Sequence, residues 1–370
     1  MIPLNQNLNN LKRSAIRVYT NLARETPDCV SLTIGEPDLD TPENIKAAAV
    51  AALQDNRTHY APNQGTAALR QAVADYENVK PEQVLITIGA CQALFTALLG
   101  ILNPGEEVIV PTPGFGLYET IATIAGARTV CLDVTKTGFQ IDKAALEAVI
   151  TPKTKAIILN SPNNPTGVIF SEESLAAVKE AVLGKPIFVV CDNVYNQLSY
   201  GACPDLSRDT ELKDQLLLCQ SFSKPWAMTG WRVGYLICPE YVMDRLLLLS
   251  AATITAVPTF VQEAAVTALK TDPAPMRQIY ARRREYVCSR LRDMGLAFPE
   301  PEGAFYVFVD IRKFGMTSDE FCTRMIREGK VAAVPGSCFG AEGYIRLSYC
   351  YGEEELKTGL DRMETFLAAL

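Results

Sequence analysis

The chain has 370 residues, of which 48% are hydrophobic and 21% are charged, and its formal net charge is −7. A chain of this length and composition can bury a large core, and it suits two domains better than one. The sequence lacks basic clusters interleaved with aromatic residues, so we expect no nucleic-acid partner.

The cysteine pattern, the single histidine and the length of the apolar segments argue against a disulfide-bonded, a metal-binding and a membrane protein. Eleven cysteines, an odd number without paired spacing or a secretory signal, favour a reducing compartment, and we expect a cytoplasmic protein. A single histidine, His59, argues against a metal site. The most apolar window, residues 246–261, is shorter than the roughly 20 residues that cross a bilayer, so we expect no membrane contact.

Buried strands alternate with helical segments over residues 41–269, which predicts a parallel or mostly parallel sheet covered by helices on both faces. The Asp-Pro-Ala-Pro sequence at residues 272–275 is a natural boundary. We therefore predict a large domain of residues 41–272 and a discontinuous small domain of residues 1–40 and 273–370, with the site between them. The small domain is predicted to contain helices over 276–294, 317–328 and 353–370 and strands over 303–310, 331–334 and 344–348.

A strand predicted over residues 84–88 leads into Gly89, Ala90 and Cys91 and then into an apolar helix over residues 93–102. A glycine at such a turn lets N–H groups at the helix start point at a phosphate, whose charge the helix dipole favours. Ala90 and Cys91 are therefore candidate anion contacts, although Cys91 can equally be a small apolar helix residue.

Two more predicted strands end in loops that can carry function. Residues 108–110 lead into a Pro-Gly turn that presents Phe115, whose ring can stack on a flat ligand or belong to the core. Residues 156–159 lead into the cluster 161–167, Ser-Pro-Asn-Asn-Pro-Thr-Gly, whose composition is first of all that of a turn.

An apolar strand over residues 186–191 ends at Asp192, and Tyr195 follows three residues later. A carboxylate in this position can pair with a protonated pyridine nitrogen, or it can be an ordinary helix cap or turn residue.

The next apolar strand, residues 216–219, leads into Ser221, Ser223 and Lys224, with Arg232 downstream. A lysine amine condenses with an aldehyde to a Schiff base, and hydroxyls with a guanidinium can neutralise a phosphate. Most lysines are solvated surface charges, but ligand sites of open α/β sheets gather at the carboxyl ends of strands. The stretch could therefore hold a phosphorylated aldehyde.

Arg346 lies in an alternating strand late in the chain. Its planar guanidinium can take a carboxylate through two parallel hydrogen bonds, whereas an arginine in a strand otherwise forms a surface ion pair.

In this order, residues 161–167, 192–195 and 221–224 with Arg232 resemble the motifs of class I and II aminotransferases, which are fold type I pyridoxal-phosphate enzymes. The resemblance runs from residue 31 to residue 348. It implies an α/β fold whose large domain has a mostly parallel, seven-stranded type of sheet flanked by helices, with a smaller α+β domain beside it.

The resemblance also implies a role for each candidate around the ring of pyridoxal 5'-phosphate. Lys224 would hold the cofactor as a Schiff base and act as the catalytic base. Asp192 would pair with the ring nitrogen, Asn164 and Tyr195 would donate to the ring oxygen, and Phe115 would stack on the ring.

The remaining candidates would bind anionic groups. Arg346, with Gly35 and Asn164, would bind the substrate carboxylate, and Tyr60 would reach the phosphate of the other subunit in a homodimer. The phosphate would otherwise be held by Ala90, Cys91, Ser221, Ser223 and Arg232.

Three positions depart from the family pattern. Cys91 stands where the family has a hydroxyl, so one phosphate hydrogen bond is in doubt. Asn193 replaces a glutamate, and Phe115 replaces a tyrosine or tryptophan.

The implied reaction is amino transfer between an L-amino acid and a 2-oxo acid. An aspartate-using subgroup has a lysine at the position of Cys91, so its absence favours a neutral or aromatic donor. A carbon–sulfur lyase, which eliminates at Cβ with the same lysine, stays open as the alternative. A ligand-sensing regulator would need an appended DNA-binding domain, and a pseudoenzyme would have no need of the intact charged set.

Overall fold

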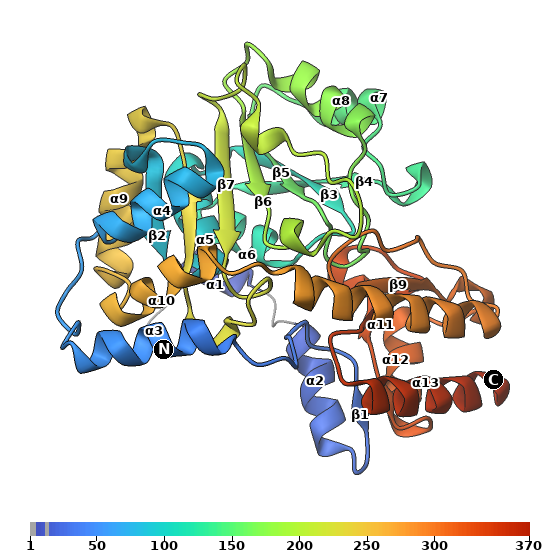
Figure 1. The fold of residues 1–370 in the computed structure, drawn as a ribbon. Helices are drawn as coiled ribbons and strands as arrows, with labels where there is room; N and C mark the ends of the chain where they lie inside the picture. The colour runs from blue at the N-terminus through green and yellow to red at the C-terminus, as the bar shows by residue number, and fades with distance from the viewer. Residues whose placement is uncertain (1–4, 12–14) are drawn as a thin grey trace.

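The computed structural model describes residues 5–11 and 15–370, and its larger part is built on a seven-stranded sheet (Figure 1). The strands are Val84–Thr87 (β2), Glu107–Thr112 (β3), Arg128–Asp133 (β4), Thr154–Asn160 (β5), Phe188–Asp192 (β6), Leu216–Ser221 (β7) and Gly234–Ile237 (β8). Their order is β2-β8-β7-β6-β5-β3-β4, and β8 runs antiparallel to both of its neighbours while the other pairings are parallel. The expected mostly parallel sheet is confirmed.

Alternate residues of each central strand enter different cores, because successive side chains of a strand point to opposite faces. In β7, for example, Leu216 and Leu218 belong to one core and Leu217 to the other. The strands therefore read as continuous apolar runs, as expected for a sheet covered on both sides.

Helices cover the two faces. One face is covered by Gly89–Ile101 (α5), Leu117–Ile124 (α6) and Glu240–Ile254 (α9). The other is covered by Glu43–Gln54 (α3), Ala67–Glu77 (α4), Lys143–Val149 (α7), Glu172–Val182 (α8) and Thr259–Leu269 (α10). A short helix, Gln6–Asn9 (α1), contacts α6. Within the described ranges, none of these helices has the length and apolarity needed to cross a bilayer.

A smaller domain joins both ends of the chain around a second core, which also includes Tyr195 and Leu198 of the large domain. Its elements are Ala15–Glu25 (α2), Val30–Ser31 (β1), Ala274–Asp293 (α11), Tyr306–Asp310 (β9), Ser318–Arg327 (α12), Val331–Ala332 (β10), Val334–Pro335 (β11), Tyr344–Ser348 (β12) and Glu353–Ala368 (α13). Figure 1 shows the blue α2 beside the orange and red α12 and α13. The sheets are β11-β12-β9, antiparallel, and the parallel pair β1-β10, so N-terminal and C-terminal residues share one ladder.

Several predicted boundaries were wrong. The single strand expected over residues 331–334 is two strands in different sheets, because β10 pairs with β1 whereas β11 pairs with β12. The strand expected from Gly303 begins at Tyr306, after Ala304 adopts a positive φ of 57°. The helix expected from Ala93 begins at Gly89. The division at residues 40/41 and 272/273 stays a prediction, and residues 1–4 and 12–14 of its small domain lie outside the described residues.

Candidate active site

A cavity of about 240 Å³ lies at the carboxyl edge of the large sheet, against the small domain. It is the place where parallel α/β sheets bind ligands. Tyr60 is the exception among the sequence candidates, since it is 93% exposed and does not line this cavity. The candidates that do line it are Gly35, Ala90, Cys91, Phe115, Asn164, Asp192, Tyr195, Ser221, Ser223, Lys224, Arg232 and Arg346.

Lys224 follows the end of β7 and points into the cavity. Its Nζ donates to the backbone oxygen of Gly35 at 2.6 Å, and it lies 5.8 Å from the ring centre of Phe305. Burial lowers the pKa of Lys224, against the opposing effect of Cys350 and Glu36. A lowered pKa increases the neutral fraction of the amine, which is the form that acts as nucleophile or base.

Asp192 is the last residue of β6 and is 3% exposed. Its Oδ2 accepts from the Tyr118 hydroxyl at 2.6 Å, whereas its Oδ1 is buried without a hydrogen-bond partner. Burial raises the pKa of Asp192 to about 6, although the bonds from Tyr118 and the Val194 backbone oppose that rise. A buried carboxylate with one unpaired oxygen is suited to receive an N–H group or a cation.

Two serines and an arginine line the end of the cavity near α5. Ser221 Oγ lies 2.8 Å from Ser223 Oγ, and the Arg232 guanidinium donates to the backbone oxygens of Thr229 and Ile88. A side chain at Gly89 would come within 2.6 Å of Arg232 Nη2, so only glycine leaves this corner open. The α5 N-terminus, the hydroxyls and the guanidinium together make an anion cradle.

Arg346 faces the cavity from β12 in the small domain and is 2% exposed. Its Nη1 donates to Asn164 Oδ1 at 2.8 Å and its Nη2 to the Thr33 carbonyl, while its Nε is buried without a partner. The guanidinium lies between the rings of Tyr306 and Phe339, at 4.4 and 4.9 Å. Such stacking holds the planar fork in one orientation, as carboxylate binding requires.

Asn164 and Tyr195 line the same cavity. Asn160, at the end of β5, receives the Asn164 backbone N–H on its Oδ1 and donates to the Asp192 carbonyl, so it links the two loops. The Tyr195 hydroxyl lies 2.7 Å from that of Tyr306. Phe115 contacts the edge of Tyr118, with ring centres 5.9 Å apart.

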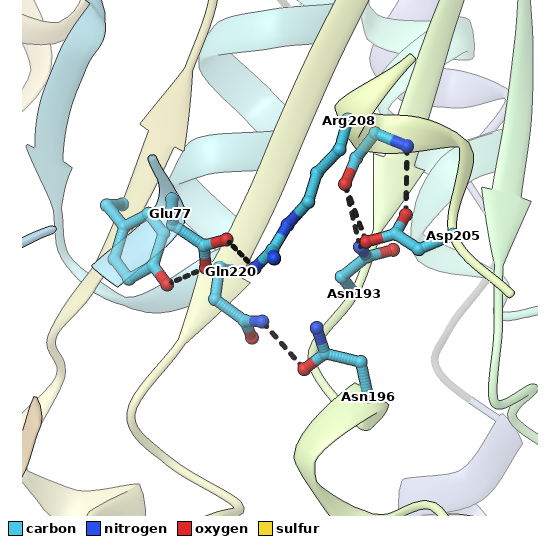
Figure 2. Close-up of polar contacts among 8 residues, drawn as sticks. Glu77, Asn193, Asn196, Asp205, Arg208 and Gln220 are labelled. Atoms are coloured by element: carbon cyan, nitrogen blue, oxygen red, sulfur yellow. Dashed lines mark hydrogen bonds and ion pairs between the residues drawn. The ribbon is translucent and has the colours of Figure 1, made fainter. Parts of the chain in front are cut away.

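Asn193, the residue after Asp192, is hydrogen-bonded to the loop that carries Asp205 and Arg208 (Figure 2). Asn193 donates to Asp205 Oδ2 at 3.1 Å. Arg208, three residues after Asp205, pairs with the buried carboxylate of Glu77 at 3.0 Å. The Glu77 carboxylate also accepts from Tyr235. The asparagine that replaces the family's glutamate therefore joins Asp192 to a loop fastened on α4.

A larger cavity, of about 540 Å³, lies at the opposite edge of the sheet, near the amino end of β7. Its acidic groups are already engaged, since Glu77 pairs with Arg208 and Asp209 with Lys179. Position in the fold and unpaired polar atoms, rather than volume, identify the smaller cavity as the site.

The residues present fit pyridoxal phosphate. Asp192 Oδ1 has no partner and can accept from a ring N–H, Arg232 lies against Gly89 where a Cβ would collide with it, and Lys224 offers an amine with a lowered pKa. Burial of the carboxylate without a second donor would otherwise leave a polar atom unsatisfied.

Three polar residues of the site were missed in the sequence. Tyr118 lies three residues beyond Phe115, in the first turn of α6, and this closeness in sequence could have identified it. Asn160 directly precedes the recognised turn, and Tyr306 lies in a predicted strand where an aromatic residue is ordinary core. The apolar lining residues Ile16, Ile34, Leu94 and Val194 carried no signal beyond hydrophobicity.

A two-domain α/β fold with a lysine, a buried carboxylate and an anion cradle at the sheet edge defines a fold type I pyridoxal-phosphate enzyme. The family model for aminotransferase class I and II matches residues 27–363, and the chain belongs to that family. The family uses pyridoxal phosphate, and the protein is a pyridoxal-phosphate-dependent aminotransferase.

Three comparisons show that the chain is similar to aminotransferases named for different substrates. The chain is 40% identical to a probable N-acetyl-LL-diaminopimelate aminotransferase of Bacillus subtilis (strain 168), covering 98% of this chain and 95% of that one. It is 37% identical to the aromatic-amino-acid aminotransferase 2 of Thermococcus litoralis, covering 98% of each. The structure of the Thermus thermophilus aspartate aminotransferase with maleate has a TM-score of 0.94 at 35% identity, covering 99% and 100% of the chains.

Asp192 gives a pH prediction for cofactor affinity. The ionised carboxylate is the form that pairs with a protonated ring nitrogen, so affinity is full above a pKa of about 6 and falls as the pH drops through that value. Between pH 7.5 and pH 5 the apoprotein should lose about tenfold in affinity for pyridoxal phosphate relative to Asp192→Asn. Fluorescence titration of both apoproteins measures the ratio, which cancels the ionisation of the cofactor itself. If cofactor affinity changed equally with pH in the two proteins, the pairing of Asp192 with the ring nitrogen would be refuted.

Proposed function

We propose that this aminotransferase moves the amino group of a neutral or aromatic L-amino acid to a 2-oxo acid, with Lys224 as the catalytic base. The observation that carries the proposal is the meeting of Lys224, Asp192 and Arg346 in one cavity with apolar residues around them. The donor leaves as a 2-oxo acid and the acceptor leaves as an amino acid, so the two halves balance without an external oxidant.

Bound pyridoxal phosphate supplies an electron-accepting ring. Asp192 Oδ1 would hold the ring's N–H, and the Lys224 amine would take the proton from the substrate Cα. Arg346 would fix the substrate carboxylate through its fork, so that the Cα–H bond faces Lys224. Tyr195 and Asn164 would donate to the ring oxygen, and the Gly89 corner with Ser221, Ser223 and Arg232 would hold the phosphate.

The lining of the cavity supports the donor preference. The charged side chains along it are Lys224, Asp192, Arg232 and Arg346, each of which already has a role in this scheme. No further cation from the described residues lines it to receive a second carboxylate, whereas Ile16, Ile34 and Leu94 offer apolar contacts. The relatives named above act, by their names, on diaminopimelate, aromatic and aspartate substrates, so identity alone does not choose among donors. All three are named as aminotransferases, which favours amino transfer over the lyase alternative.

We also propose a homodimer in which Tyr60 completes the phosphate cradle of the other subunit. Tyr60 is almost fully exposed and lies outside its own chain's cavity. An exposed side chain is free to reach a neighbouring subunit, as the resemblance implies for Tyr60.

Lys224→Ala should lower kcat/KM by at least about 10⁴-fold, because both the covalent link and the base are lost. Mass spectrometry after borohydride treatment should find no added mass on the peptide of residue 224. Lys155→Ala, which removes a lysine that lies over the Phe188 ring outside the cavity, is the matched control and should keep its activity. Multiple turnover by the Lys224 variant would contradict the role.

In the amino-donor half of the reaction, kcat/KM for leucine or tyrosine should exceed that for aspartate by about tenfold, or ~1.4 kcal/mol, because a second carboxylate on the donor would be desolvated without a partner. Steady-state assays with aspartate, alanine, leucine and tyrosine measure the order. Cys91→Lys should narrow the gap by improving aspartate. A wild-type preference for aspartate would overturn the donor assignment while leaving amino transfer intact.

Tyr60→Phe should weaken cofactor binding by about tenfold, the effect of one hydrogen bond to a charged group. Tyr241→Phe, a second exposed tyrosine, is the control and should change nothing. In a heterodimer of Tyr60→Phe with Lys224→Ala, purified by two tags, the Tyr60→Phe subunit receives an intact tyrosine and should regain wild-type affinity. A heterodimer without recovery would exclude contribution across the interface.

A further inference from the structure

Tyr306 contacts three parts of the site, although the resemblance to the family assigns it no role there. It is the first residue of β9 and is buried. Its ring lies 4.4 Å from the guanidinium centre of Arg346, and its hydroxyl lies 2.7 Å from that of Tyr195. A Cβ at Gly35 would come within 1.8 Å of the same hydroxyl, so the absence of a side chain there makes room for it.

The direction of the bond between the two tyrosines follows from counting protons. A phenol has one proton to donate, and its oxygen can accept. When the Tyr195 hydroxyl donates a hydrogen bond to the ring oxygen of the cofactor, the bond between the tyrosines can persist only if Tyr306 donates and Tyr195 accepts. Burial raises the pKa of Tyr306 to about 12 and that of Tyr195 well above its usual value, so both phenols keep their protons near neutral pH.

We propose that Tyr306 is a positioning residue that donates its hydroxyl proton to Tyr195 and thereby strengthens the hydrogen bond from Tyr195 to the ring oxygen of the bound cofactor. Hydrogen bonds in a chain polarise one another, so the second donor makes the first a stronger one. The inference rests on the role given to Tyr195 in the proposed function. It adds a second tyrosine, from the small domain, to the control of the cofactor.

The ring of Tyr306 has a separate effect, on the substrate side. Together with Phe339 it confines the Arg346 guanidinium to a plane. The hydroxyl and the ring can be removed independently, since Tyr306→Phe deletes only the former and Tyr306→Leu deletes both. Tyr306 thus acts on the cofactor oxygen through its hydroxyl and on the Arg346 guanidinium through its ring. The two substitutions separate these effects.

The test is a pH titration of the visible absorption of the holoenzyme. A donor to the ring oxygen competes for that oxygen with the protonated nitrogen of the lysine–cofactor linkage, so it favours loss of the proton. Tyr195→Phe should therefore raise the midpoint, by about one pH unit for ~1.4 kcal/mol. Tyr306→Phe should raise it by roughly a third as much, in line with a cooperative effect. The double variant should match Tyr195→Phe alone, because Tyr306 acts through Tyr195.

The other titratable groups that line the cavity stay the same in all these variants, so they cannot produce the pattern. From the large domain they are Lys224, Arg232, Asp192 beside Tyr195, Tyr118 on α6 and Cys91 on α5, and from the small domain Arg346 on β12. Tyr200→Phe is the matched control, since its hydroxyl bonds the Ala304 carbonyl and Tyr349 outside the cavity, and it should leave the midpoint unchanged.

Three results would decide against the proposal. An unchanged midpoint in Tyr306→Phe with a raised one in Tyr195→Phe would show that Tyr306 is only a packing residue, and the proposed function would stand. Unchanged midpoints in both would remove the role of Tyr195 and the inference with it. Additive shifts in the double variant would show that Tyr306 does not act through Tyr195.

The kinetic constants and melting temperature give a readout independent of the absorption change. Tyr306→Phe should keep the KM for the amino acid within about twofold, whereas Tyr306→Leu should raise it by about tenfold through loss of the stacking on Arg346. Equal KM values for the two variants would show that the ring does not hold Arg346. A melting temperature close to wild type for Tyr306→Phe excludes unfolding as the cause of its raised midpoint.

Discussion

Two opposite charges, Asp192 and Arg346, are buried in one cavity, and the geometry of the site depends on how each is kept there. A charge buried without partners costs several kcal/mol. Asp192 receives the Tyr118 hydroxyl, and Arg346 is held by Asn164, the Thr33 carbonyl and two aromatic rings. Each still has one buried polar atom without a partner, Oδ1 and Nε. The fold thus completes part of the solvation of both charges, and a bound ligand can complete the remainder.

The two charges come from different domains, so the site exists only where the domains meet. Arg346 bonds Asn164 and Tyr306 bonds Tyr195, and both bonds join β9 or β12 to loops at the carboxyl edge of the large sheet. Apolar contacts cross the same boundary, because Phe139 of the large domain packs edge to face with Phe308 and Tyr344, and the small-domain core includes Tyr195 and Leu198. The relative position of the domains at the cavity is therefore set by apolar packing together with polar contacts of defined geometry.

The large sheet and the residues at its carboxyl edge could be predicted from the sequence because strands buried on both faces are continuous apolar runs and polar motifs follow them directly. β4 was missed because its side chains are mostly exposed or half-buried, so it has no apolar run. β8 was also missed, because it has only four residues and begins two residues after Arg232, whose backbone adopts a positive φ of 54°. Tyr118 and Tyr306 were missed because a buried tyrosine looks like core until its hydroxyl partner is known, and that partner lies 74 residues away for Tyr118 and 111 for Tyr306.

Residues 33–35 bind two of the cationic side chains of the site, Lys224 and Arg346, through neutral backbone atoms. Lys224 donates to the Gly35 carbonyl and Arg346 to the Thr33 carbonyl, so one short backbone segment serves both. Carbonyl groups lower the cost of burying a cation without neutralising it, and the full charge stays available to an anion. A carboxylate that bonds Arg346 competes with the Thr33 carbonyl, and an aldehyde that takes the Lys224 amine removes the bond to Gly35. Ligand binding and the position of this segment are therefore coupled through the same two donors.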